Sequence, residues 1–401
     1  MTVASPVVRP VRYPASGINT GPAMAGVPAP ALSWDFAKGE GLGRLAITRA
    51  TAAWALGPSG LYQQVPSGAP AYEWSAAGAL LGLRREPART NRALWCRDLT
   101  NAAWVAVNMT AAKDQVGIDG VAAAASSITA GAANATLLQT VTVASTLRTL
   151  SVFIKRITGT GGIELTEDGG LSWTAVTSSV VSTGYTRVAV SQTILNPVFG
   201  IRLVTSGDKV AVDFVQIEDG HCMTSPIATT TVAVARNADA LLLSSTAFSE
   251  AWNAAEGTIL VAFSMPLAPP ASSFPIVLSA NDGTANERVT VSITETSGAI
   301  NLGLTDGGVV QATCAIASLA AYTGAPMRYA GAWRANDVRS AGQTGTFSTQ
   351  DTVATLPTVT QLQLGDQAGG SAPVTPIHYR SLSYWPRRLP DQQLRALAMA
   401  A

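Results

Sequence analysis

Charged side chains are scarce in this sequence. They make up 13% of the 401 residues, against roughly 25% in an ordinary soluble domain. The 26 basic and 25 acidic residues leave a formal charge of +1, so the chain has no net field to attract nucleic-acid phosphates or an anionic membrane surface. We therefore expect neither nucleic acid nor membrane among its partners.

Histidine and cysteine are also few. His221 and His378 are the only histidines, so a mechanism that needs a histidine base has little choice. Cys96, Cys222 and Cys314 lie far apart, without a CxxC pair or a nearby histidine pair to complete a metal site. We interpret the cysteines as buried apolar residues. The absence of P-loop and GxGxxG patterns argues against nucleotide binding.

Long apolar runs are missing. No stretch approaches the ~18 uninterrupted apolar residues of a membrane span, and the N-terminal sequence MTVASPVVRPVRYPAS contains no signal-peptide core. We expect a protein that does not span a membrane and is not exported by a signal peptide.

What the sequence does contain is short runs of Val, Ile, Leu and Thr, interrupted by 36 glycines and 22 prolines. This pattern predicts many short strands joined by turns. We expect an all-β chain with two antiparallel β-sandwich (jelly-roll) domains in tandem after an extended N-terminal arm. The expected units are the arm at 1–33, a β-hairpin region at 34–104, a first sandwich at 105–240 and a second sandwich at 241–401.

Candidate strands recur at intervals of roughly 8–15 residues. They are 137–143, 150–157, 162–165, 186–191, 199–204 and 210–218 in the first sandwich, and 257–264, 274–280, 287–294, 300–305, 309–315, 327–334, 337–341, 360–364 and 378–385 in the second. Alternation within 210–218 predicts one face formed by Val210, Val212, Phe214 and Gln216 and another formed by Ala211, Asp213, Val215 and Ile217. The segment RRLPDQQLRALAMA places Leu394, Leu397 and Ala398 at helical spacing after Pro390, which predicts a C-terminal helix.

The segment TEDGGLSW, residues 166–173, fits the Asp-box pattern and looks like one repeat of a sialidase propeller. In this turn Asp168 accepts hydrogen bonds from turn amides, Gly169 and Gly170 permit positive φ, and Trp173 packs under the turn. Because a single copy is present, we interpret it as a structural turn.

Sugar binding requires an aromatic plane beside a few amides or charged groups. The candidate glycan-binding residues are Trp173, Trp252, Trp333, Arg334 and Asn336. A tryptophan in a sandwich is more often part of the core, so both interpretations stay open. No cofactor is expected, although Asp282, Asp306 and Asp366 stand in expected loops and are weak candidates for calcium ligands.

Glycoside hydrolysis needs two carboxylates about 5–10 Å apart across a cleft. The acidic pairs Glu167/Asp168 and Glu218/Asp219 are adjacent, so in a strand their side chains point to opposite faces. A glucanase-type E-x-D-x-x-E run is absent. We therefore expect no catalytic residue.

Several short motifs occur in order along the chain. They are TRAT at 48–51, PARTN at 87–91, NAAW at 101–104, QIEDG at 216–220, NAD at 237–239 and the W-x-R-x-L-x-D-x-x-L tail at 385–394. In this order, over nearly the whole chain, they resemble a group of virion appendage proteins of tailed bacteriophages or phage-like gene transfer particles, found as head spikes and tail fibres. The resemblance implies a carbohydrate-binding-module-like sandwich followed by a concanavalin-A-like, or laminin-G-like, sandwich. The intervening RALWCRDLT departs from the group, so we expect different local packing there.

The function implied by the resemblance is adhesion of a virion-surface subunit, made in the host bacterial cytoplasm, to host surface polysaccharide. Residues 1–33 would bind head or tail proteins of the particle, and a homo-oligomer is expected, with a trimer favoured, because linked weak sites gain avidity. The alternatives are a capsid-decorating or tail structural protein that binds only virion neighbours and, less favoured, a glycan depolymerase.

Overall fold

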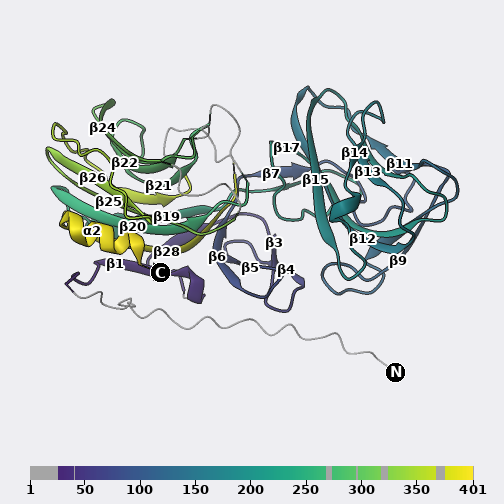
Figure 1. Ribbon diagram of the computed structural model, residues 1–401, viewed down its shortest axis with the longest axis horizontal. Helices are drawn as coiled ribbons and strands as arrows, with labels where there is room; N and C mark the ends of the chain where they lie inside the picture. Colours follow the sequence, from purple (N-terminus) through teal and green to yellow (C-terminus); the bar gives the residue numbers. More distant parts are fainter. Residues whose placement is uncertain are drawn as a thin grey trace.

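The computed structural model describes residues 26–39, 41–267, 273–294, 297–317, 324–366 and 375–400. Regular structure in these residues is almost entirely β, and the sheets are antiparallel sandwiches, which confirms the expected fold class. Figure 1 shows two lobes side by side, with the strands of residues 53–85 below and between them. Residues 1–25 of the expected arm lie outside the described residues. No helix in the described part of the chain is long and apolar enough to cross a membrane.

The first sandwich consists of two five-stranded sheets. We call one the inner sheet, with the order β15-β12-β17-β10-β9, and the other the outer sheet, with the order β14-β13-β16-β11-β8. The inner strands are β9 (Met109–Gln115), β10 (Ala125–Ala130), β12 (Thr146–Thr158), β15 (Thr186–Ile194) and β17 (Lys209–Asp219). The outer strands are β8 (Val105–Val107), β11 (Ala135–Thr140), β13 (Ile163–Thr166), β14 (Thr174–Ala175) and β16 (Val198–Leu203). Alternate residues such as Leu137, Val152, Phe199 and Val212 fill the core between the sheets.

The alternation predicted for 210–218 is wrong beyond Asp213. The register of β17 against β12 shifts at this point, and Phe214 has a positive φ of 43°. An extra residue in one strand reverses the faces that follow it. Val215 and Ile217 therefore join Val210 and Val212 in the core, whereas Phe214 points out of the sandwich.

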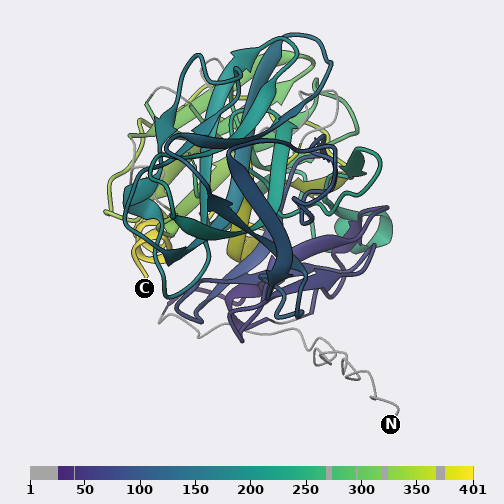
Figure 2. The same cartoon turned by 90° about the vertical axis from the view of Figure 1, so that its right-hand side faces the viewer.

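The outward face of the inner sheet is covered by the N-terminal part of the chain. The hairpin of β3 (Ala53–Leu56) and β4 (Tyr62–Val65) brings Trp54 edge-on to Phe214, with ring centroids 5.4 Å apart, and Tyr62 edge-on to Phe153 at 5.2 Å. Arg97 lies over the Phe214 ring at 4.3 Å and donates from Nε to Asp213 at 2.7 Å. Figure 2 shows the N-terminal strands lying along one side of this lobe.

The second sandwich consists of two seven-stranded sheets. We call them the helix-covered sheet, with the order β26-β25-β20-β28-β6-β5 and with β1 also paired to β28, and the polar sheet, with the order β2-β19-β27-β21-β22-β23-β24. The helix-covered strands are β1 (Leu32–Asp35), β5 (Ala71–Trp74), β6 (Leu80–Arg85), β20 (Glu256–Ser264), β25 (Met327–Arg334), β26 (Asp337–Gly342) and β28 (Ile377–Trp385). The polar strands are β2 (Ala46–Thr48), β19 (Ala240–Ser244), β21 (Ile276–Asn281), β22 (Arg288–Ile293), β23 (Ile300–Asp306), β24 (Val309–Ile316) and β27 (Gln361–Leu364). The short helix α1 (Ser245–Ser249) follows β19.

Strands β1, β2, β5 and β6 thus complete both sheets of the second sandwich, whereas β3 and β4 pair only with each other. The domain boundaries expected from the sequence stay predictions. The helix α2 (Asp391–Met399) forms where it was predicted, and it buries Leu394, Leu397 and Ala398 against the outward side of the helix-covered sheet.

A network of buried charges joins the two sandwiches. Arg49 donates to Asp239 at 2.6 Å, and Glu86 lies between Arg84, at 3.2 Å, and Arg236, at 3.4 Å. Strands β7 (Arg89–Asn91) and β18 (Val234–Arg236) pair beside this network. Three of the motifs that carried the family resemblance, at 48–51, 87–91 and 237–239, therefore meet at the junction, and their described contacts are structural.

Candidate functional site

The residues predicted to bind glycan do not gather at one place. Trp173 lies in the first sandwich, and Trp252 and Trp333 lie inside the second. Arg334 is the last residue of β25, and Asn336 lies in the turn that leads to β26. The structure therefore offers separate sites to consider, and each follows from its local geometry.

The Asp168 turn is held by its own side chains. Asp168 accepts hydrogen bonds from Thr166 Oγ1 at 2.8 Å and from the backbone N–H of Ser172 at 2.9 Å. Gly169 and Gly170 have φ of 75° and 91°. Burial opposes ionisation of Asp168, but the hydrogen bonds from Ser172 outweigh it and lower its pKa to about 2. The turn is thus fixed against the outer sheet, and it holds Trp173 at a defined place.

Trp173 lies on the outward face of the outer sheet. The Arg202 guanidinium covers its ring at 4.3 Å from the centroid, and Arg202 is also ion-paired to Glu164 on the neighbouring strand. A Cβ at Gly170 would lie 2.9 Å from the Trp173 ring, so only glycine leaves room for the indole. The half-buried ring is thereby immobilised beside a charged pair.

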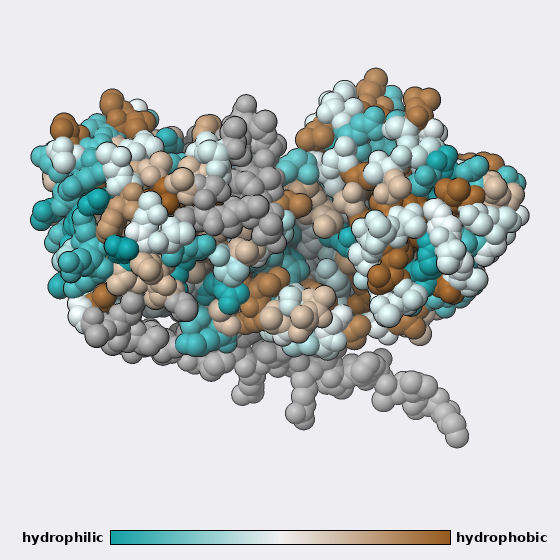
Figure 3. Space-filling view, viewed as in Figure 1, coloured by the Kyte–Doolittle hydropathy of each residue, from teal (hydrophilic) through white to brown (hydrophobic). Residues whose placement is uncertain are grey.

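The strand register extends this arrangement across the sheet. Arg202 is opposite both Glu164 and Thr136, and Thr136 is opposite Val107 on β8. Because residues directly opposite each other on paired strands point to the same face, these side chains form one row. We call the set Trp173, Arg202, Glu164, Thr136 and Val107 the Trp173 face. Figure 3 shows apolar and polar residues intermingled over the lobe that contains it.

Sequence reasoning missed Arg202, Glu164 and Thr136. Each occupies an outward position in a strand whose neighbours, such as Leu165 and Ile201, point into the core. The period of two was visible in the sequence, but the pairing of β13 with β16 across 32 or more residues was not.

Trp252 and Trp333 form an internal aromatic stack with Tyr384. The Trp252 ring lies 5.5 Å from Trp333 and 4.6 Å from Tyr384, and Phe248 stacks on its other side at 5.0 Å. Only 2% of Trp333 is exposed, so this residue offers no ring face to a sugar here. Both tryptophans contribute to the core of the second sandwich.

Arg334 and Asn336 belong to a tight turn. The exposed Arg334 pairs with Asp337 at 2.9 Å. Asn336 has φ of 57° and accepts a hydrogen bond at Oδ1 from the N–H of Ala354 at 3.1 Å. An asparagine at positive φ is a typical turn former, so its side chain is engaged by the backbone.

Each of the three candidate calcium ligands interacts with a different partner. Asp282 accepts hydrogen bonds from Thr284, which lower its pKa, Asp306 accepts one from Thr355, and Asp366 is 3.7 Å from Arg85. Within the described ranges, no group of three His, Cys, Asp or Glu residues is close enough to hold a metal ion.

The adjacent acidic pairs point in opposite directions. Glu167 is 2% exposed, and burial raises its pKa to about 8, whereas Asp168 faces the turn. Glu218 is fully buried and accepts hydrogen bonds from Thr224, whereas Asp219 is partly exposed and pairs with Arg92. Neither pair presents two carboxylates to a common cleft, as hydrolysis of a glycosidic bond requires.

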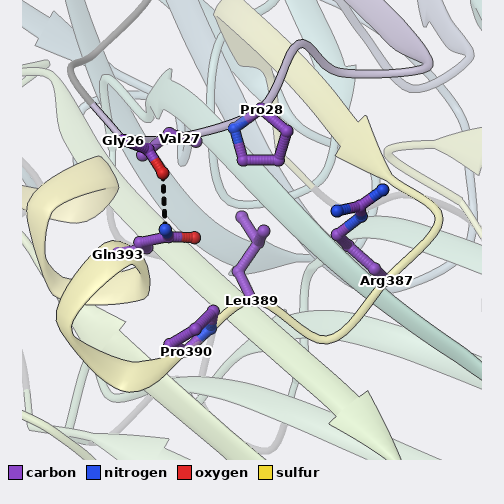
Figure 4. Close-up of a pocket in the computed structure, with 7 residues that line it drawn as sticks. All are labelled: Gly26, Val27, Pro28, Arg387, Leu389, Pro390 and Gln393. Carbon is purple, nitrogen blue, oxygen red and sulfur yellow. Dashed lines mark hydrogen bonds between the residues drawn. The ribbon is translucent and has the colours of Figure 1, made fainter.

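A shallow hollow of about 540 Å³ lies beside α2. Figure 4 shows residues 26–28 lining one side of it, with Gln393 Nε2 donating to the carbonyl oxygen of Gly26 at 2.5 Å. Trp385 Nε1 donates to the carbonyl oxygen of Pro28 at 2.6 Å, and Val27 packs on the apolar cluster under α2. Its one charged lining residue is Arg387, so the hollow serves to hold the chain rather than to perform chemistry.

Comparisons with known proteins give similarity in structure alone. No family model and no curated sequence match this chain. The CBM40 of Ruminococcus gnavus IT-sialidase, bound to α2,3-sialyllactose, matches at 16% identity and a TM-score of 0.30, over 36% of this chain and 84% of its own. The binding domain of botulinum neurotoxin DC, in complex with rat synaptotagmin II, matches at 9% identity and a TM-score of 0.33, over 40% of each chain.

Proposed function

We propose that this chain is a non-catalytic virion subunit, a head spike or tail fibre of a tailed phage or phage-like particle, that adheres to host surface glycan through the Trp173 face. The ordered motifs over nearly the whole sequence support the family. The contacts of Trp173 support the place of binding.

The observation that carries the site is the immobilised indole on an open sheet face. The inner sheet is covered by the N-terminal hairpin, and the helix-covered sheet is covered by α2. The outer sheet instead has Trp173 half-buried beside the Arg202–Glu164 pair. An aromatic ring accepts the apolar face of a pyranose, and a neighbouring guanidinium and carboxylate donate to and accept from its hydroxyls. Preorganisation by strands lowers the entropic cost of binding.

The last part of the proposal is avidity from several linked copies of the site. A flat site of this size binds one sugar weakly, and several linked copies raise the effective concentration. We propose a homo-oligomer, with a trimer favoured, mounted on the virion through residues 1–33.

The test is binding of the labelled, purified protein to host cells before and after their capsule is removed. We expect binding that depends on the capsule and falls about tenfold or more with Trp173→Ala, while the glycan keeps its mass. Leu171→Ala is the matched control, since Leu171 is an apolar residue of the same turn with 91% exposure. Thermal unfolding checks that both variants fold. Equal binding by Trp173→Ala and the wild type would place the contact elsewhere, and loss of glycan mass would favour the depolymerase.

One observation favours the alternative of a structural protein that binds only virion neighbours. Val105 and Val107 on the edge strand β8 are 63% and 54% exposed, and an exposed apolar edge is a common place for pairing between proteins. This alternative predicts no binding to cells with or without capsule, and retention of the protein on purified particles.

A further inference from the structure

The strand β8 forms one edge of the outer sheet, and its free side is not used by the function proposed above. It pairs with β11 on one side, where Ala106 is opposite Leu137. In the part of the chain that the structure describes, no strand pairs with its other side. An edge strand presents backbone N–H and C=O groups that can accept a further strand. The outer sheet can therefore be extended at β8.

The side chains of β8 are exposed and aliphatic. Val105 and Val107 are 63% and 54% exposed, and Ala106 between them is also exposed. Leu138 on β11 is directly opposite Val105 and is half-buried. Because opposite residues on paired strands share a face, Val105, Val107 and Leu138 form an apolar strip along this edge. The strip offers no charge, amide or aromatic ring to nucleic acid or sugar, so its chemistry fits a protein partner.

The other edge strands of the first sandwich are better protected against pairing. On the inner sheet, β9 contains the exposed Lys113 and Asp114, and β15 contains Arg187, which donates to the carbonyl oxygen of Thr224. On the outer sheet, β14 is only two residues long. Charged side chains and very short strands are common means of preventing contact between sheet edges. Although β8 is also short, its three residues are uncharged.

The sequence of β8 is complementary to itself. Val-Ala-Val reads the same in both directions, so antiparallel pairing with β8 of a second copy places Val105 opposite the partner's Val107. Ala106 is then opposite the partner's Ala106. Each exposed valine meets a valine, and no charge meets a like charge. Two-fold contacts between identical surfaces are the commonest kind in homo-oligomers.

We propose that β8 pairs antiparallel with β8 of a second copy of this chain, so that the two outer sheets join into one continuous sheet. The self-complementary sequence is what favours a second copy over an unrelated virion protein. A two-fold contact joins chains in pairs, so it is distinct from the three-fold contact that a trimer needs.

The pairing places two Trp173 faces on one surface. The two-fold axis of an antiparallel strand pair is perpendicular to the sheet, so both faces point the same way. Arg202 lies on β16, which is two strands from the edge, and the two copies of Arg202 are thus five strand spacings apart, roughly 24 Å at ~4.8 Å per strand. This consequence rests on the proposed function, whereas the pairing does not. One extended glycan chain reaches both faces, which raises the avidity.

The first experiment is a disulfide cross-link in the full chain carrying Ala106→Cys. Opposite residues of antiparallel strands have Cα atoms about 4.5–5.5 Å apart, within the roughly 4.4–6.8 Å that a disulfide spans. The three native cysteines are buried. We expect air oxidation to yield a disulfide-linked pair of chains on a non-reducing gel. Ala189→Cys is the matched control, since Ala189 is an exposed alanine on the edge strand β15, and it should stay a single chain.

The second experiment is the mass of the particle in solution by light scattering. Val105→Lys places a charge at the contact, so we expect pairing to weaken about tenfold or more and the mass to fall to half that of the wild type. Thr193→Lys adds the same charge at an exposed position of β15 and should leave the mass unchanged. Thermal unfolding checks that both variants fold.

Two outcomes would overturn the pairing: no linked pair from Ala106→Cys, or equal masses for Val105→Lys and the wild type. If the masses are equal but Val105→Lys no longer stays on purified particles, β8 binds a virion neighbour instead of a second copy. None of these measurements contains glycan. Their failure is therefore distinguishable from failure of the capsule-dependent binding that tests Trp173.

Discussion

Each of the two sandwiches has one sheet whose outward face is covered by another part of the chain, and the two coverings differ. The inner sheet of the first sandwich is covered by the N-terminal hairpin, with aromatic edges and the ion pair of Arg97 and Asp213, and buried charges continue through the junction. The helix-covered sheet of the second is closed by α2 through aliphatic contacts such as Leu394 and Leu397. We therefore expect the stability of the junction to depend on the ionisation of its side chains, and the stability of the α2 contact not to.

The largest expected effect is at the junction. Asp239 is 1% exposed, and it accepts from Arg49 at 2.6 Å and from the N–H of Glu86 at 2.8 Å. Asp239→Ala leaves Arg49 buried without its carboxylate, so we expect the free energy of unfolding to fall by roughly 3–5 kcal/mol. Denaturant titration measures this loss.

The control is an exposed ion pair. Arg44 and Glu250 are 2.8 Å apart with side chains about half exposed, so Glu250→Ala should cost less than about 1 kcal/mol. Equal losses for both variants would remove the distinction between junction and surface.

The dependence of stability on pH extends the comparison, because the pKa of one buried glutamate, Glu86, is lowered and that of another, Glu167, is raised. Burial opposes ionisation of Glu86, but Arg84 and Arg236 outweigh it and lower its pKa to about 2 from the ordinary 4.5. The stability from this carboxylate, on the order of 3 kcal/mol, is present above pH 4.5 and is lost as the pH falls toward 2. We expect the cost of Glu86→Gln to be full at pH 7 and to vanish near pH 2.

Glu167 makes stability change with pH in the opposite direction. Burial raises its pKa to about 8, so the folded chain keeps a proton that the unfolded chain releases above pH 4.5. Stability is therefore lost as the pH rises from 4.5 to 8. Glu167→Gln should stabilise the chain increasingly over that window and level off above it. Thermal unfolding from pH 2 to 9 tests both variants, and parallel curves for variant and wild type would contradict these assignments.

The second sandwich is expected to respond to packing instead. Gly257 is opposite Trp333, and a Cβ there would lie 2.4 Å from the indole. Gly257→Ala forces the aromatic stack to move, so we expect a loss of about 1–3 kcal/mol that does not change between pH 5 and 8. Gly184→Ala has nothing within 4 Å of the new Cβ and is the matched control, expected to be nearly neutral.

How far the sequence predicted this molecule depends on the kind of residue. Periodicity located many of the strands of both sandwiches and the helix at Leu394, because core positions repeat along one strand. It missed β8, β9, β10 and β14 of the first sandwich and β19 of the second. It could not locate the bulge at Phe214, since a positive φ at phenylalanine is set by the hairpin packed on it. Nor could residue type separate Trp173 from Trp333, because burial of a ring depends on strands distant in sequence.

The outward polar residues of the polar sheet are a second example of a feature that only strand pairing explains. QLQL and RVTVSI display the alternation that places Gln361, Gln363, Arg288 and Thr290 outward. Their meeting depends on the pairing of β27 with β21, about 80 residues earlier in the chain, which no local pattern encodes. The family motifs, in turn, identified the junction residues and not a ligand site.

The smallest effect we expect is at residues 26–28, which pass over the apolar cluster beneath α2. Gln393 donates to Gly26 on an exposed surface, so Gln393→Ala should cost about 0.5 kcal/mol. Gln392→Ala in the same helix turn gains the same helix propensity without losing this bond, so the difference between the two variants isolates the contact. A difference of zero in denaturant titration would mean that Val27 and the Trp385 hydrogen bond alone hold the segment. In that case the attachment of residues 26–28 would not depend on a polar contact to α2. The second sandwich would then differ most clearly from the junction, where buried ion pairs provide the stability.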